Sequence, residues 1–212
     1  GFGIVMMTIG SIAVLFFSPE SLAQILEIPQ GTKFLTSMLP IAVTMCVSMS
    51  CTTANSISLE GKNLWILKSS PVSPKTIFNS KIAVNLLITI PAIFINGIII
   101  TIGIGLKLTD LLVLLAMPIA YAFFIAISGL IINLKLPKLE WTTEVTVIKQ
   151  SAAVLVSMLI GMVILFIPAI LIFTVPINPL IINGIAIVVV ALLSMLLYRY
   201  LTTKGEQLFS AL

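Results

Sequence analysis

Long apolar runs separated by short polar stretches dominate the hydrophobic pattern of this 212-residue chain. Six runs can be marked, at about residues 1–17, 34–57, 82–106, 111–133, 152–175 and 180–198. At about 1.5 Å per residue, a helix of about twenty residues crosses a hydrocarbon core of about 30 Å. Because the runs are continuous rather than alternating, they predict six transmembrane helices and not barrel strands. The first run is the shortest.

Composition supports the membrane interpretation. Of all residues 59% are hydrophobic and 8% are charged, and the mean hydropathy is +1.25. A soluble domain of this length could not bury so much apolar surface. We therefore expect an all-α polytopic membrane protein with a single transmembrane domain over residues 1–212. The chain opens inside an apolar run, which predicts a fragment of a longer protein.

The basic residues predict the orientation in the membrane, because Lys and Arg near span ends stay on the cytoplasmic side. Nine of the eleven fall on one predicted side, and only Lys33 and Lys107 fall on the other. The nine are Lys62, Lys68, Lys75, Lys81, Lys135, Lys138, Lys149, Arg199 and Lys204. Two long loops and the C-terminus are thus expected in the cytoplasm. Lysines in short loops do not form the aromatic-bearing basic face of a nucleic-acid binder, so no such partner is expected.

Several chemistries are disfavoured by the residues that the runs lack. None of the six contains an internal Asp, Glu, Lys, Arg or His, and the chain has no histidine. Ion-coupled carriers usually need such a residue to carry the coupling charge. Phosphate-binding Gly-rich loops, zinc-binding His/Glu patterns and Gly-x-Ser-x-Gly elbows are also missing from the sequence. We expect no enzyme activity and no cofactor in this chain.

The loop after the second run contains an apolar cluster around Trp65. Lys62 and Lys68 flank the cluster, and Pro71 follows it. This pattern predicts a short helix that ends before the proline. Aromatic residues with flanking lysines fit an anchor at the lipid surface, and they also fit docking on a partner protein.

This loop resembles the signature of bacterial ATP-binding-cassette (ABC) type-2 permeases, on Glu-Gly-Lys at 60–62, Trp65, Leu-Lys-Ser at 67–69 and Pro-Val-Ser-Pro at 71–74. A second stretch, Leu-Pro-Lys-Leu-Glu-Trp at 136–141 followed by Glu144 and 147–151, is similar to the next cytoplasmic loop of that family. The resemblance covers about residues 52–157. It implies the C-terminal six-span part of a longer permease in a bacterial plasma membrane, with the C-terminus in the cytoplasm.

The same resemblance implies partners. In such permeases the loop after the second span rests on a separate ATPase subunit, which binds the ATP, and a second permease half or subunit completes the path. Membrane lipid is the remaining partner. Carried onto this sequence, the ATPase contact would comprise Glu60, Gly61, Lys62, Trp65, Lys68 and Pro71.

The second run contains a polar stripe. As a continuous helix it would place Thr44, Ser48, Thr52 and Ser56 on one face, with Asn55 beside them. We favour close helix packing for this stripe, since small hydroxyl residues let membrane helices approach each other, and a polar substrate path is the alternative. Prolines inside the runs, at Pro40, Pro91, Pro118 and Pro168, each remove one backbone hydrogen bond and favour a kink.

Taken together, the sequence favours the transmembrane permease of an ABC exporter that couples to a separate ATPase. The alternative is a non-transporting membrane scaffold that recruits a cytoplasmic partner. The substrate cannot be inferred from the apolar runs.

Overall fold

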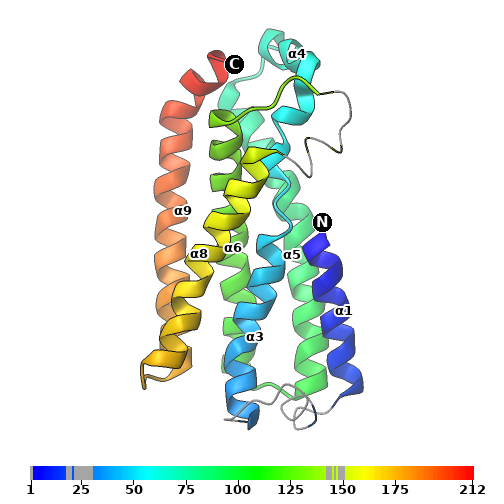
Figure 1. Cartoon of the computed structure of the whole chain (residues 1–212), viewed down its shortest axis with the longest axis vertical. Coiled ribbons are helices and arrows are strands. Elements are labelled where there is room, and N and C mark those ends of the chain that lie inside the picture. The colour runs from blue at the N-terminus through cyan, green and yellow to red at the C-terminus, as the bar shows by residue number, and fades with distance from the viewer. Residues whose placement is uncertain (1, 18–20, 22–30, 142–144, 146, 148–150) are drawn as a thin grey trace.

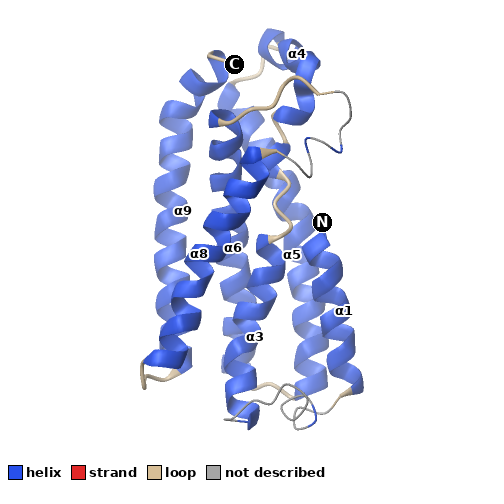
Figure 2. Cartoon of the chain, viewed as in Figure 1, coloured by secondary structure: helices blue, strands red, loops and turns tan. Residues whose placement is uncertain are grey.

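The computed structural model describes residues 2–17, 21, 31–141, 145, 147 and 151–212. Within these residues the chain is helical, with no strand (Figure 2). The helices are α1 (Phe2–Phe16), α3 (Gly31–Ser48), α4 (Leu64–Ser69), α5 (Pro74–Ile104), α6 (Leu108–Lys135), α8 (Ala152–Thr174) and α9 (Pro179–Ser210), with 3-10 segments η1 (Thr53–Asn55) and η2 (Ser58–Asn63).

Five stretches within the described residues are long and apolar enough to cross a membrane, and α1 adds a shorter apolar helix of 15 residues. The expectation of an all-α, multi-pass membrane protein is therefore confirmed. The long helices run side by side as one bundle (Figure 1). One end carries α4 and the C-terminus, and we call it the α4 end. The other carries the α5–α6 and α8–α9 connections, and we call it the turn end.

Helix α6 lies in the middle of this bundle. In its most apolar stretch 56% of the residues are buried inside the protein, against 22% in α8 and α9. Its side chains, such as Tyr121 and Leu130, take part in clusters with every other long helix. The outer faces of α5, α8 and α9 expose large apolar residues instead, as lipid-facing helices do.

Two helices extend beyond the predicted spans, toward the α4 end. α5 begins at Pro74 rather than near residue 82, because the Ser73 side chain accepts a hydrogen bond from the Thr76 N–H (3.3 Å) and proline suits the first helical turn. α9 continues to Ser210 rather than ending near 198. Its last turns are held by packing, and Phe209 meets Phe78 of α5 edge to face with ring centroids 5.9 Å apart.

The second apolar run does not form one continuous helix, so that prediction is wrong. The run was expected at 34–57, but α3 ends at Ser48 and the chain passes into turns and the 3-10 segments η1 and η2. These residues still belong to the apolar stretch Thr36–Gly61, which is long enough to span a membrane. We call residues 49–63 the interrupted segment.

Candidate functional site

The interrupted segment is rich in side chains that compete with a helix for backbone hydrogen bonds. Between Ser48 and Ser58 the sequence holds Ser, Cys, Thr and Asn at most positions and no proline. Such side chains bond to nearby backbone groups and offer the chain an alternative to the helical ladder. Ser56, for example, donates its hydroxyl to the carbonyl of Thr53 at 3.0 Å.

Asn133 of α6 satisfies the backbone where η2 begins. Its Oδ1 accepts hydrogen bonds from the N–H groups of Ile57 (2.8 Å) and Ser58 (3.1 Å), and its Nδ2 donates to Ser58 Oγ at 2.7 Å. The side chain of Asn133 is fully buried. Irregular backbone at membrane depth is tolerated where protein groups replace the missing hydrogen bonds, and Asn133 supplies them.

Asn85 of α5 does the same at the start of the interrupted segment. Its Oδ1 accepts from both the N–H (2.9 Å) and the hydroxyl (2.8 Å) of Thr52. On the other side the segment presses against α6 at Gly129, where an added Cβ would lie 2.6 Å from Cys51 Sγ. The segment is therefore clamped between α5 and α6 and is not a free loop.

These contacts decide where the predicted polar stripe lies. Thr44 and Ser48, both buried, donate their hydroxyls along α3 to the carbonyls of Pro40 (2.6 Å) and Thr44 (3.0 Å). Thr52, Asn55 and Ser56 lie past the end of α3, so the five residues do not share a helical face.

The two loops that carry the family resemblance meet at Ser58. Its hydroxyl accepts from the Lys138 N–H at 3.0 Å, and its carbonyl accepts from Trp141 Nε1 at 2.9 Å. Three residues later, Gly61 has a backbone conformation with φ +48° and ψ −122°, which residues other than glycine rarely adopt. A Cβ on Gly61 would lie 2.8 Å from Trp141 Nε1, so glycine is also needed for the close approach.

An ion pair between Glu60 and Lys81 ties η2 to α5. It joins Glu60 Oε1 to Lys81 Nζ, and both side chains are half-buried. Glu60 and Gly61 thus help to hold the loop on the bundle. The sequence analysis predicts both at the contact with an ATPase subunit. The side chain of Lys62 lies outside the described residues.

Helix α4 follows η2 directly and lies at the end of the bundle (Figure 1). Its Leu64 is buried, whereas Trp65 and Ile66 are 66% and 51% exposed. The expectation of a short helix around Trp65 is confirmed, and the helix ends at Ser69, before the exposed Pro71.

Lys68 connects α4 to the end of α9. Its Nζ donates to the carbonyl of Ser210 at 3.3 Å. Between the two helices lies a groove of about 260 Å³, whose lining includes Leu67, Val72, Glu206 and Phe209. The exposed face of α4 and this groove together form a surface with apolar and charged groups side by side.

We call this surface, with Trp65, Ile66, Lys68 and Pro71, the α4 platform. Sequence reasoning placed Trp65, Lys68 and Pro71 there but missed Ile66 and the supporting roles of Ser58, Asn133 and Trp141. An asparagine inside an apolar run, as at positions 85 and 133, was the available signal, since a buried amide needs partners.

The described residues contain no group of three or more His, Cys, Asp or Glu able to hold a metal ion. Comparisons with protein-family models, with curated proteins and with solved structures give no match to this chain.

Proposed function

We propose that this chain is the membrane-spanning permease part of an ABC-type exporter, and that a separate ATPase subunit docks on the α4 platform. ATP would be bound and hydrolysed by that subunit, while this chain would contribute the substrate path together with a second permease half or subunit. The proposal includes a bacterial plasma membrane with the α4 end and the C-terminus in the cytoplasm.

The observation that carries the proposal is the meeting of two loops at Ser58. Both loops resemble the permease family in sequence, they lie about eighty residues apart in the chain, and hydrogen bonds of 3.0 and 2.9 Å join them. The orientation has independent support, because Lys68, Lys75, Lys138 and Lys204 belong to segments at the α4 end.

The chemistry of the α4 platform suits protein docking. Interface hot spots are enriched in Trp and Arg with polar rims around an apolar centre, and Trp65 and Ile66 would supply that centre. Lys68 and Pro71 lie at its edge. Burying both apolar side chains against a partner would remove them from water, which favours association.

A mechanical connection from the α4 platform to the spans also supports the proposal. η2 leads directly into α4, and the same η2 is bonded to α6 through Asn133 and to α5 through the Glu60–Lys81 ion pair. A displacement of α4 by a closing ATPase would therefore act on two spans at once. Such coupling requires two states whose balance the partner shifts.

The proposal is tested by purifying the tagged chain from its native membrane and measuring the ATPase activity that accompanies it. With Trp65→Ala and Ile66→Ala combined, we expect that activity to fall by at least about tenfold, since hot-spot truncations cost about 2 kcal/mol or more and tenfold is about 1.4 kcal/mol. The matched control is Leu87→Ala, which removes an exposed apolar side chain of α5.

Two outcomes would contradict the proposal. One is ATPase activity that is unchanged in the double variant. The other is a co-purifying protein without a nucleotide-binding motif, lost in the same variant, which would favour the scaffold function instead.

A further inference from the structure

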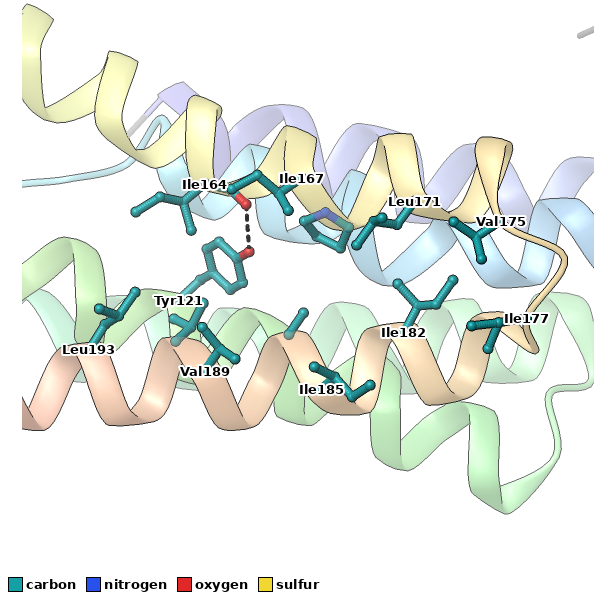
Figure 3. A pocket seen from close by; sticks show the side chains of 13 residues that line it. Tyr121, Ile164, Ile167, Leu171, Val175, Ile177, Ile182, Ile185, Val189 and Leu193 are labelled. Atoms are coloured by element: carbon teal, nitrogen blue, oxygen red, sulfur yellow. Dashed lines mark hydrogen bonds between the residues drawn. The ribbon is translucent and has the colours of Figure 1, made fainter.

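An apolar cleft lies between α8 and α9, with α6 as its floor (Figure 3). It encloses about 280 Å³, and side chains such as Ile164, Leu171, Ile182 and Val189 line it. Both flanking helices are membrane-spanning in length and composition, and Ile185, which lines the cleft, is 60% exposed. The cleft therefore opens sideways toward lipid.

The floor offers no free polar group to a ligand. Among the described lining residues Tyr121 carries the only polar side-chain atom, and its hydroxyl donates to the carbonyl of Ile164 at 3.3 Å (Figure 3). That carbonyl lacks a helical partner because Pro168, four residues later, has no N–H. The hydroxyl and the carbonyl satisfy each other, so the cleft suits hydrocarbon alone.

At the turn end this cleft adjoins a polar pocket of about 770 Å³. The two share Val175 and Ile177 as lining residues. The lining of the polar pocket also includes Lys107, Thr109 and Asp110, around the start of α6. Within the described residues no salt bridge pairs Lys107 or Asp110. An apolar slot between two membrane-spanning helices thus lies next to a charged mouth at the turn end.

We infer that this pair of pockets binds a phospholipid, with one acyl chain between α8 and α9 and the phosphate near Lys107. A purely apolar ligand would leave the charged mouth unused. The site goes beyond the proposed permease role and does not depend on an ATPase.

The test uses the full chain in lipid nanodiscs with a minor fraction of phospholipid that carries a photoreactive diazirine in mid-chain. Labelled peptides are then mapped by mass spectrometry. We expect labelling of the cleft residues of α8 and α9 to saturate with probe and to exceed, several-fold, that of the outer face of α5 around Leu87 and Ile102, which are both highly exposed.

Two substitutions on one helix separate the cleft from ordinary lipid contact. Ala186 lines the cleft, so Ala186→Trp should fill it and reduce the saturable labelling at least about fivefold. Val188, two residues along α9, is 58% exposed and is not a lining residue, so Val188→Trp should leave the labelling unchanged.

The polar mouth is tested with Lys107→Ala and two probes. Labelling by the phospholipid probe should fall, whereas labelling by a diazirine hydrocarbon without a headgroup should not. The inference is overturned if α5 and the cleft are labelled equally, if Ala186→Trp has no effect, or if both probes respond alike to Lys107→Ala. It is also overturned if the cleft is protected from lipid and cross-links to a second copy of the chain.

Discussion

The second apolar run, residues 34–57, and the fifth, which forms α8, differ in whether their helix is continuous, and in neither case is the outcome the one that its prolines would predict. α8 contains Pro168, the residue most hostile to a helix interior, and yet it is continuous from Ala152 to Thr174. The second span has no proline between residues 41 and 70, and yet its helix ends at Ser48 in the middle of the apolar stretch. The break is therefore not where a proline-based argument would put it.

The partners that neighbouring helices supply explain this difference. In α8 the carbonyl that Pro168 frees accepts one hydrogen bond from Tyr121, so the helix needs no further change. In the second span, Asn85 and Asn133 present buried amides to backbone groups that a helix would have used internally. Where lipid offers no hydrogen bonds, a break in a span is stable when neighbouring helices supply partners for its backbone.

The largest expected effect comes from removing the amide of Asn133. Asn133→Leu leaves the N–H groups of Ile57 and Ser58 buried without an acceptor, at about 1–3 kcal/mol each, so we expect a loss of about 4 kcal/mol of unfolding free energy. Reversible unfolding in mixed micelles measures it. The control is Asn63→Leu, because the exposed Asn63 makes no side-chain capping bond.

The next effect tests how the interrupted segment is fixed at its far end. Gly61→Ala combines a strained backbone, about 1–3 kcal/mol, with a Cβ placed 2.8 Å from Trp141 Nε1, so we expect a loss of about 3 kcal/mol. Gly105→Ala is the matched control. Gly105 also has positive φ (+71°) but open space around it, and the expected loss is only about 1 kcal/mol. Equal losses would show that the contact with Trp141 is unimportant.

A smaller effect is expected at Asn85, which serves one residue of the segment rather than two. Asn85→Leu removes the acceptor of the Thr52 N–H and hydroxyl, and about 2 kcal/mol should be lost in the same unfolding assay. Asn96 of the same helix is the comparison. Its Oδ1 has no partner among the described residues, so Asn96→Leu should cost less, and a greater cost there would contradict the explanation.

The smallest effect tests the fifth span. Tyr121→Phe removes the donor to Ile164 and should cost about 1 kcal/mol, in the range measured for hydrogen bonds between membrane helices. In a Pro168→Ala background residue 168 regains its N–H and can serve that carbonyl, so the same Tyr121→Phe change should cost almost nothing. An undiminished cost would mean that Tyr121 does not act through the carbonyl.

The sequence predicted the helical membrane class, the five stretches long enough to cross a membrane and the short helix before Pro71, because each depends on local pattern and composition. It placed the start of α5 and the end of α9 less well, since Ser73 and Phe209 extend these helices outside the apolar runs. It missed the break after Ser48 for a different reason. That break depends on amides 33 to 76 residues away in the chain, which a pattern within the span cannot contain.

The residues of the candidate site show the same difference between local pattern and contacts distant in the chain. Trp65 and Lys68 could be placed on an exposed helix from local pattern, whereas the meeting of the two loops at Ser58 requires the folded bundle.

The central claim is that an ATPase docks on the α4 platform, and a photo-crosslinking residue at position 65 tests it most directly. With benzoylphenylalanine in place of Trp65, irradiation of native membranes should join the chain to a protein whose sequence contains a nucleotide-binding Walker motif. The same residue in place of Leu87, which is exposed on α5, should not. Adducts at position 65 with lipid alone, or with a protein lacking that motif, would contradict the account.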